Sequence, residues 1–519
     1  MLRIMPSDGH APRPASPRPV ALLGLDLGSS SLKALLLDIT GRVLAERGAG
    51  YPTRAPATGW AEQDPDDWWA AAGEATRAAL DDVPGVDVVG IGLGGQMHTF
   101  VLHDAEGAPV RPAITWMDTR AAGLLPAVEA TIDAVGLRDE LANPVVLGLT
   151  LPPLLWLRER EPAAWARART LLLAKDTLRL RLTGEPGSEP TDASATLLFD
   201  VAGRRWSAAA LEAFGVDPAL VPALGEPGAA AGRLAAGAAR HLGLRAGIPV
   251  AFGAGDVQSA AIGTGTVRPG QAQLMVGSGA QALVVEAGPP AGEAAGLHAF
   301  CHARGWLRQA SVNNAGVALD WARNLLGLSW DELYGAFGDA APAAAPLFLP
   351  YLTGERAPLM KGHARGGWLG LEPAHDREAL ARAAVAGVVA AIADGVRALP
   401  GGGGTAVRAA GGGLRHPGFA RGVADASGAT LELLEASAAS AVGAALLGGV
   451  ACGAFADLDA AVARAPTAIG ATVAPRPERA ATWAALRERL RALDALGLHE
   501  AVAGREVTPA DPGPSERDP

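Results

Sequence analysis

Residues 24–38 read GLDLGSSSLKALLLD, an apolar segment that carries Asp26, then a Gly-Ser turn, then a second apolar segment. This order predicts a β-hairpin, for which Gly28 and Ser29 are sufficient turn residues. The hairpin gives no structural reason for an aspartate within its first strand. A carboxylate at the mouth of such a turn is suitably placed to hold Mg²⁺ through water molecules, so Asp26 is a candidate metal residue.

Two further glycine clusters lie next to apolar segments, at residues 277–279 and 411–413. Glycine-rich turns expose consecutive backbone N–H groups that bind phosphate oxygens, and serine hydroxyls add donors. Each cluster alone favours an ordinary hairpin, whereas the three clusters together with Asp26 favour nucleotide binding. The sequence has no GxxxxGK[ST] motif, which excludes a P-loop enzyme. The candidate nucleotide-binding residues are Gly28, Ser29, Ser30, Ser31, Gly277, Ser278, Gly279, Gly411, Gly412 and Gly413.

The composition indicates a multidomain protein with large buried cores. The chain has 519 residues, 49% of them hydrophobic, which suggests two or three domains. Its formal charge of −10 argues against nucleic acid or an anionic membrane surface as partners. The two cysteines, Cys301 and Cys452, argue against a disulfide framework and are typical of a reducing cytosol. We therefore expect a cytoplasmic protein.

Neither end of the chain has the features of a targeting signal, and we expect disorder over residues 1–20 and 499–519. Residues 436–456 carry no charge and are long enough to span a bilayer. Because they are mainly Ala, Gly and Ser, we interpret them as a buried helix packed through small residues. No membrane span is predicted.

Strands alternate with helices in both halves of the chain, which predicts an α/β protein. Near the start of one predicted helix, Asp64 can cap the first turn and Pro65 suits the first position. Another helix is expected over residues 377–399. The expected domains are residues 21–265, which include the first hairpin, and residues 266–498, which include the other two glycine clusters.

Asp256 and the consecutive residues Gln96, Met97 and His98 are the remaining candidates for chemistry. Asp256 follows an apolar strand and a Gly-Ala-Gly turn and begins a predicted helix, so it is either a helix N-cap or a general base between the two halves. Met97 alone is typical of a core residue, and His98 alone of a hydrogen-bonded interior histidine. Residues 115–120 either line a polar pocket or form a capped turn.

The ordered set of motifs resembles the FGGY carbohydrate kinases, and within them the xylulokinases, from about residue 21 to residue 452. No single motif is specific, but ten occur in order at compatible spacing. They are GLDLGSSSLKALLLD, WAEQDPDDWW, GLGGQMH, RPAITWMDTR, LLWLREREP, AKDTLRLRLTG, TDASATLLFD, GAGD, LFLPYLTGERAP and GGGLRHP.

The resemblance implies a two-domain actin-like ATPase fold, with ribonuclease-H-like cores and an active-site cleft between the domains. It implies ATP and Mg²⁺ as cofactors, with Asp26 beside the metal and the glycine loops around the nucleotide. Asp256 matches the family's catalytic base, and Gln96, Met97, His98 and Asp256 would contact a ketopentose, for which D-xylulose is the best match. The implied partners are a small sugar and ATP, and a homodimer is left open.

The sequence departs from the xylulokinase pattern at several positions. Val257 follows the base where the family has Asn, Met117 replaces the Asn of WNDTR, and Pro153 replaces a Lys. The second phosphate loop reads Gly-Ser-Gly-Ala instead of Gly-Thr-Ser-Gly. Two departures touch the expected sugar pocket, which leaves ribulose, a ketohexose or glycerol as alternative acceptors. The fold also serves non-kinase ATPases, a less favoured alternative.

Overall fold

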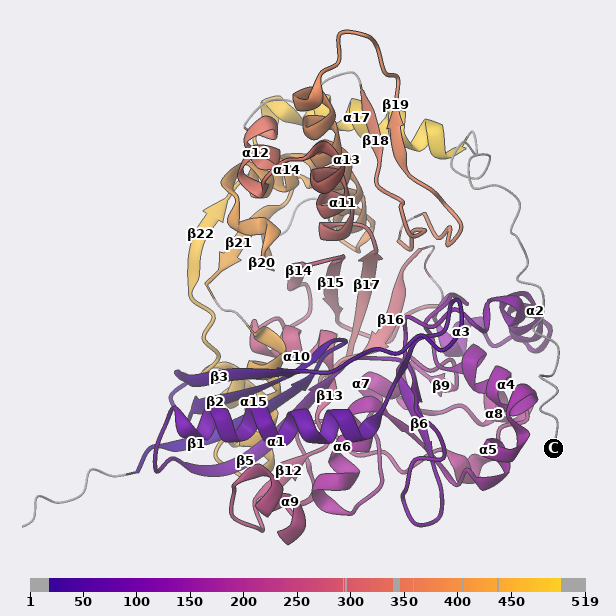
Figure 1. Cartoon of the computed structure of the whole chain (residues 1–519), viewed down its shortest axis with the longest axis vertical. Coiled ribbons are helices and arrows are strands. Elements are labelled where there is room, and N and C mark those ends of the chain that lie inside the picture. Colours follow the sequence, from indigo (N-terminus) through magenta and orange to yellow (C-terminus); the bar gives the residue numbers. More distant parts are fainter. Residues whose placement is uncertain are drawn as a thin grey trace, which may run out of the picture.

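The computed structural model describes residues 18–292, 294, 296–338, 346–357, 359–402, 406–435 and 438–495. Within these residues the chain forms two bodies, each built on a central sheet, with the earlier residues in the lower body of Figure 1 and most of the later ones in the upper body. The two predicted disordered ends lie outside the described residues, except for residues 18–20, which lead into the first strand.

The first sheet has the strand order β11-β12-β5-β1-β2-β3, and β13 pairs with β5. The predicted hairpin is confirmed, because β1 and β2 pair antiparallel with Asp26 opposite Lys33. β5 is central and runs parallel to β1 and to the short strands β12 and β13. The strands are β1 (Val20–Leu27), β2 (Ser31–Asp38), β3 (Val43–Gly50), β5 (Asp87–Gly95), β11 (Ala230–Arg233), β12 (Pro249–Ala251) and β13 (Ala254–Gly255).

Helices cover both faces of this sheet. Because side chains alternate along a strand, Leu23 and Leu25 of β1 pack toward α1 (Pro65–Asp81), while Leu22 packs toward α15 (Ala439–Ala451). As predicted, α1 begins at Pro65 after the N-cap Asp64. Asp26 is four positions beyond Leu22 and therefore lies on the α15 face, where α10 (Asp256–Gly263) also packs.

Helix α15 comes from late in the chain but packs on β1 and β5 of the first sheet (Figure 1). The approach is close because the facing strand positions are glycines: a Cβ at Gly24 would meet the backbone of Ala441, and one at Gly92 the backbone of Ala444. The interpretation of residues 436–456 as a buried helix is confirmed for α15. With α16 (Leu458–Val462), which packs on α15, this segment lies with the first sheet although in sequence it comes between β21 and β22 of the second sheet.

A small sheet of order β4-β7-β6-β8 extends the first body, and helices α2 to α5 and α8 surround it (Figure 1). Apolar side chains of Phe100, Ile114 and Leu173 form its core with those of the helices. The elements are β4 (Glu62–Gln63), β6 (Phe100–His103), β7 (Ala113–Ile114), β8 (Thr170–Leu173), α2 (Leu125–Val135), α3 (Arg138–Leu141), α4 (Leu151–Arg160), α5 (Pro162–Arg167) and α8 (Ala208–Ala213). Helices α6 (Ala174–Thr183), α7 (Pro190–Ala193) and α9 (Ala236–Leu242) complete this body.

The second sheet has the order β16-β17-β15-β14-β20-β21-β22. Its strands are β14 (Ala272–Val276), β15 (Ala280–Glu286), β16 (His298–Cys301), β17 (Trp306–Val312), β20 (Ala406–Ala410), β21 (Thr430–Leu434) and β22 (Ile469–Val473). The helices packed around it are α11 (Gly316–Leu326), α12 (Trp330–Phe337), α13 (Arg377–Ala398), α14 (Pro417–Ser427) and α17 (Ala480–Ala495), and a β18 (Leu347–Leu349) and β19 (Gly367–Leu369) pair lies beside them.

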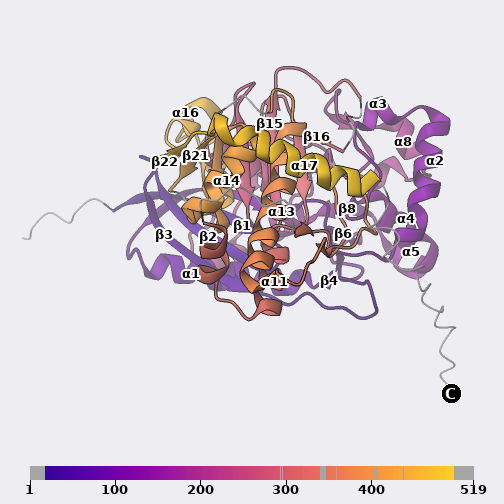
Figure 2. The ribbon, with the colours of Figure 1, turned by 90° about the horizontal axis from the view of Figure 1, so that it is seen from above.

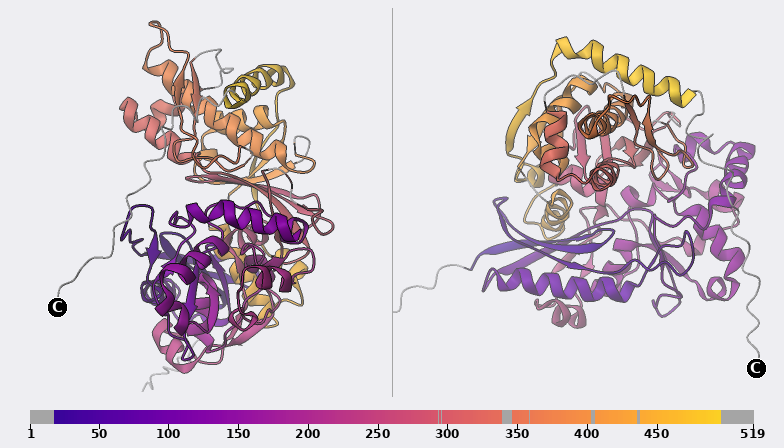
Figure 3. Two further views of the ribbon diagram at one scale, coloured as in Figure 1. Left: turned by 90° about the vertical axis from the view of Figure 1, so that its right-hand side faces the viewer. Right: turned by 45° about the horizontal axis from the view of Figure 1, so that its top comes forward.

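Helix α13 is the central helix of the second body, and α17 crosses over it and α14 (Figure 2). Figure 3 shows α17 on the outer side of this body, away from the first sheet. The helix predicted over residues 377–399 is confirmed as α13. Within the described part of the chain, α13 is the one helix long and apolar enough to cross a membrane, and most of it is buried in the second core.

The glycine contact between β5 and α15 yields a stability prediction. Gly92→Ala places a Cβ against the Ala444 backbone, which cannot move aside as the end of a side chain could. We therefore expect the free energy of unfolding to fall by about 1–3 kcal/mol. Urea denaturation measures it. Gly123→Ala is the control, because its Cβ meets no atom within 4 Å, and equal stability of the two variants would contradict the close packing.

Candidate active site

Three parallel strands of the first sheet end at one edge and bring the predicted residues together. Asp26 of β1 and Ala254 of β13 both pair with Gly94 of β5, from opposite sides. Residues 96–98 follow β5 directly, and Asp256 follows β13. Because neighbouring strands are about 5 Å apart, Asp26 and Ala254 lie about 10 Å apart across β5.

Asp256 is the first residue of α10, and the N-cap position is taken by Gly255, which makes no side-chain capping bond. The Asp256 Oδ1 accepts a hydrogen bond from the neighbouring Val257 N–H at 2.8 Å. Burial, followed by the carboxylate of Asp26, raises the pKa of Asp256 to about 7. Both protonation states of Asp256 are therefore populated near neutral pH, which is the property required of a proton acceptor.

Asp26 is held by a residue from the far end of the sequence. Ser440, in the first turn of α15, donates its hydroxyl hydrogen bond to the Asp26 Oδ1 at 2.8 Å. Burial raises the pKa of Asp26, and the Ser440 hydrogen bond opposes part of this rise. Gly94 leaves room for the contact, since a Cβ there would lie 2.9 Å from the Ser440 Oγ.

The turn of the first hairpin is anchored by side chains that the sequence analysis did not single out. Gln63 donates to the Ser29 carbonyl at 2.7 Å, and the Trp116 indole donates to the Ser29 hydroxyl at 2.9 Å. The Tyr51 hydroxyl donates to the Gly28 carbonyl. Gln63 and Trp116 belong to the quoted motifs WAEQDP and TWMDTR, so the signal was present but not assigned to the turn.

Gln96 was predicted to bind the sugar, but its side chain is fully buried beneath the turn. Its amide group donates to the Gln63 Oε1 at 2.8 Å and accepts from the Thr99 hydroxyl at 3.2 Å. Because both ends of the amide are held by protein partners, Gln96 is placed to support Gln63 and, through it, Ser29.

Met97 lies next to Asp256, and His98 follows Met97 in the chain. Met97 packs in a small apolar cluster with Val257 and Phe300, and it stands against Gly255. The His98 Nδ1 lies 3.2 Å from the Ala195 carbonyl oxygen, which can only accept, so Nδ1 carries the hydrogen. Burial, followed by the positive charge of Arg356, lowers the pKa of His98 to about 3. His98 is therefore neutral at pH 7 and keeps its Nε2 as an acceptor.

The other two glycine clusters meet at one edge of the second sheet. β14 and β20 are parallel neighbours, so residues 277–279 and 411–413 follow adjacent strand ends. Gly411 has a φ of +122°, and a Cβ there would collide with the Val276 backbone. The Ser278 carbonyl accepts from the N–H groups of Ala315 and Val317, where α11 begins. No hydrogen bond or ion pair of the described residues joins these two loops to the first-sheet group.

A buried polar cluster supports the backbone before Asp256. Gly255 N–H donates to the Thr191 hydroxyl at 3.0 Å, and that hydroxyl donates to Glu189 at 2.9 Å. The Lys175 Nζ lies 3.1 Å from Glu189, 2.8 Å from Asp176 and 3.5 Å from Asp192. All these side chains are fully buried. Burial alone would lower the pKa of Lys175, but the three carboxylates raise it, so Lys175 is charged.

The positions that depart from the xylulokinase pattern lie in different settings. Val257 is buried beside Met97, Pro153 is buried in the first turn of α4, and Met117 is 36% exposed. Of the three, Val257 is the one in contact with the predicted sugar residues. Compared with the Asn of the xylulokinase pattern, Val257 leaves no polar side chain at the position after the proposed base.

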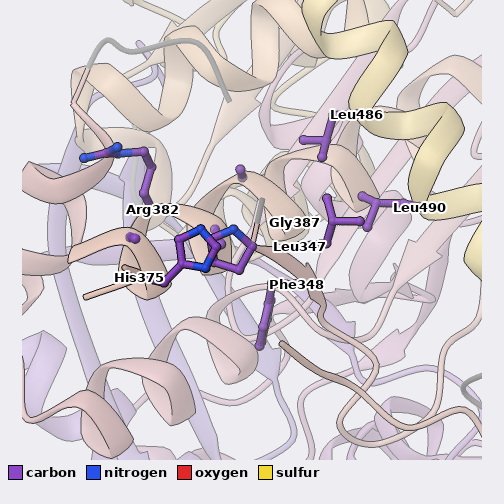
Figure 4. Close-up of a pocket in the computed structure, with 11 residues that line it drawn as sticks. Leu347, Phe348, His375, Arg382, Gly387, Leu486 and Leu490 are labelled. Atoms are coloured by element: carbon purple, nitrogen blue, oxygen red, sulfur yellow. The ribbon is translucent and has the colours of Figure 1, made fainter. Parts of the chain in front are cut away.

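A cavity of about 170 Å³ lies elsewhere, between β18, α13 and α17 (Figure 4). Its lining includes Leu347, Phe348, His375, Arg382 and Leu486. None of the predicted site residues lines this cavity. We therefore place the candidate active site at the strand ends and not here.

The N-terminal domain model of the FGGY family of carbohydrate kinases matches residues 21–263, and the C-terminal domain model matches residues 274–452. The chain belongs to the FGGY family of carbohydrate kinases. The predicted two-domain actin-like ATPase fold and the kinase activity of the class are confirmed, and FGGY kinases use ATP.

Similar proteins include xylulose kinases. The chain is 37% identical to the xylulose kinase of Escherichia coli strain K12, over 79% of this chain and 85% of that protein. It is 30% identical to the xylulose kinase of Bacillus subtilis, over 84% and 89%. A xyloylose kinase structure from Brucella ovis is 35% identical, with a TM-score of 0.84 over 93% of this chain and 100% of that one. A gluconate kinase from Lactobacillus acidophilus, at 24% identity over 92% and 99% with a TM-score of 0.85, shares the fold.

Replacing Lys175, the one lysine of the buried cluster, tests whether this cluster stabilises the fold around the end of β13. Lys175→Met leaves Asp176, Glu189 and Asp192 without their shared cation, so we expect a loss of about 3–5 kcal/mol in the free energy of unfolding. The loss should shrink between pH 7 and pH 5. Burial raises the pKa of Asp192, and Lys175 opposes part of this rise. Without Lys175 the folded state therefore takes up more protons than the unfolded chain as the pH falls, which offsets part of the loss.

Urea denaturation of wild type and variant at both pH values measures this difference. Lys33→Met is the control, because the Lys33–Glu46 pair is 4.0 Å apart and partly exposed and should contribute little. A Lys175→Met loss no larger than that of the control would contradict the cluster's role.

Proposed function

We propose that this FGGY kinase is a xylulose kinase, which transfers the γ-phosphoryl group of ATP to a hydroxyl of D-xylulose and forms D-xylulose 5-phosphate. The sugar assignment is supported by the xylulose kinases among the similar proteins, at 30–38% identity. We place the reaction in the cytoplasm, where the free Cys301 and Cys452 stay reduced. A homodimer remains a prediction.

The observation that carries the proposal is the placement of Asp256 next to Met97 and His98 at one sheet edge, with its pKa near 7. Asp256 would accept the proton of the sugar hydroxyl as that oxygen attacks the γ-phosphoryl group. Met97 supplies an apolar surface and neutral His98 an acceptor nitrogen for the hydroxyl groups of the sugar. A carboxyl with an unshifted pKa would be a weaker base at neutral pH.

The phosphate contacts are proposed for the backbone N–H groups and hydroxyls of residues 28–31 and 277–279, with residues 411–413 near the adenosine. The first turn is held in place from outside by Gln63, Tyr51 and Trp116. Because the turn is already fixed, its N–H and hydroxyl donors can bind phosphate without a free-energy cost for ordering the loop during the reaction.

We propose that Mg²⁺ reaches this site with ATP and that Asp26 is its protein carboxylate, directly or through water. In kinases, Mg²⁺ typically uses one or two carboxylates, substrate phosphates and several waters. The described residues hold no group of three or more His, Cys, Asp or Glu side chains that could bind a metal by themselves, which fits this mode. When bound, the ion would neutralise charge on the transferred phosphoryl group.

A coupled ADP-release assay over ketoses, polyols, aldoses and aldonates tests the acceptor. We expect D-xylulose to give the highest kcat/KM. Ribulose, ketohexoses and glycerol are the competing acceptors, because Val257 makes the pocket beside the base more apolar. Turnover with glycerol or an aldonate but with no ketose would refute the xylulose assignment and leave the kinase class intact.

Replacing the proposed base tests its role directly. Asp256→Asn keeps the shape of the side chain but cannot accept a proton, so we expect kcat to fall by roughly 10²- to 10⁴-fold while sugar and ATP still bind. In the wild type, kcat/KM should rise with pH through about 7, because only the deprotonated carboxyl accepts the proton. Steady-state kinetics and calorimetric binding measure both effects.

The variant should also be at least as stable as the wild type at pH 8. A carboxyl whose folded-state pKa is raised loses stability as the pH rises from its unfolded value, near 4, to about 7, and asparagine has no such loss. Near-normal turnover of the folded variant would show that Asp256 only begins α10.

A further inference from the structure

Arg356 lies on a segment of the second body that is tied to a phosphate loop. The preceding Glu355 carboxylate accepts hydrogen bonds from the Asn313 N–H at 2.6 Å and the Arg356 N–H at 2.9 Å. Asn313 follows β17, and two residues later the Ala315 N–H donates to the Ser278 carbonyl at 3.2 Å. The position of Arg356 therefore depends on the same backbone that holds residues 277–279.

From this segment the Arg356 side chain reaches the first body. Its Nη2 donates to the Leu147 carbonyl at 2.8 Å, and its guanidinium carbon lies 5.9 Å from the centre of the Trp116 ring. Gly148 makes room for it: this residue has a φ of +89°, and a Cβ there would lie 2.6 Å from Nη2. The Trp116 indole in turn donates to the Ser29 hydroxyl. Arg356 therefore lies beside the tryptophan that holds the turn of the first hairpin.

The guanidinium is also close to the proposed sugar residues. Leu147, which it contacts, lies three residues before Thr150, whose hydroxyl donates to the His98 carbonyl at 3.0 Å. Burial, and then the charge of Arg356, lowers the pKa of His98 and of His298. An arginine side chain offers five N–H donors. Among the described residues, Leu147 supplies the one hydrogen-bond acceptor that these donors meet. Arg356 is only partly buried, so donors remain for a ligand.

We infer that Arg356 is a specificity-determining residue of the second domain, which donates hydrogen bonds to oxygen atoms of the sugar bound by the first domain. The inference rests on the proposed function and deepens it. A polyol or ketose presents neighbouring oxygens that match the planar fork of a guanidinium. Since Glu355 links this fork to the backbone of the second phosphate loop, the sugar and the nucleotide would be held through one segment.

The competing explanation is that Arg356 only fastens the two bodies together through Leu147. A fastening role predicts lower stability without a change in sugar selectivity. A sugar contact predicts a loss that depends on which oxygens the sugar carries. The two explanations therefore differ in a measurement of specificity and not only of activity.

The test compares Arg356→Met, Arg356→Lys and the control Arg365→Met in the full-length protein. Arg365 is an exposed arginine of the same segment whose guanidinium donates to the neighbouring Ala364 carbonyl. We expect Arg356→Met to lower kcat/KM for the preferred sugar by about 10- to 100-fold, the range for a lost charged hydrogen bond. Arg356→Lys should recover part of it, the KM for ATP should change less than the KM for the sugar, and Arg365→Met should match the wild type.

Deoxy analogues of the preferred sugar make the test specific. The analogue that lacks the contacted oxygen should be a poor substrate of the wild type but should lose nothing further in Arg356→Met. Equal losses for every analogue, or a lower melting temperature with an unchanged kcat/KM, would overturn the inference. If the wild type phosphorylates only a non-ketose acceptor, the xylulose assignment fails and the same variants test Arg356 with that acceptor. If it phosphorylates none, both fail.

Discussion

The parallel pairing of β5 with β1 and β13 is the constraint on which the candidate active site depends. Its register puts Asp26 and Ala254 level with Gly94, so the residues that follow each strand come out at one edge. The glycines at the end of β5 are equally necessary. A Cβ at Gly94 would lie against Ser440, and one at Gly95 would lie 2.8 Å from the Lys175 Cβ. A larger residue at either position would displace a group that supports Asp26 or the backbone before Asp256.

The raised pKa values of Asp26 and Asp256 follow from the burial of both carboxyls at this sheet edge. Asp26 and Asp256 share a partly buried region, and each pKa is raised first by burial, with the charge of Asp26 adding to the effect on Asp256. The buried Lys175 forms its ion pairs with three other carboxylates. Lys175 therefore does not neutralise Asp26 or Asp256. A base with a pKa near 7 is the result, and such a base is close to the optimum for proton transfer at neutral pH.

Local patterns in the sequence were sufficient for the hairpin, for α1 with its Asp64 cap and for α13, because each is determined by neighbouring residues. They could not reveal that Ser440 bonds Asp26, since 414 positions separate the two. The family resemblance implied a sugar contact for Gln96, and neither it nor the local pattern shows that the Gln96 amide donates to Gln63. The Lys175 cluster escaped notice for a physical reason: charged residues are usually exposed, and burial becomes tolerable only when partners from distant segments surround them.

Contacts between segments far apart in the sequence also connect the two bodies. The chain leaves the first sheet after α10, builds most of the second sheet, returns through α15 to pack on the glycines of β1 and β5, and then adds β22 to the second sheet. Ser440 on this returning helix bonds Asp26, while Arg356 reaches Leu147 from the second body. The Ser440 contact therefore lies within the first body, beside the proposed metal residue, whereas the Arg356 contact joins the second body to the first, beside the proposed sugar residues. A movement of the second body relative to the first would therefore displace Arg356 directly, whereas Ser440 would stay with Asp26.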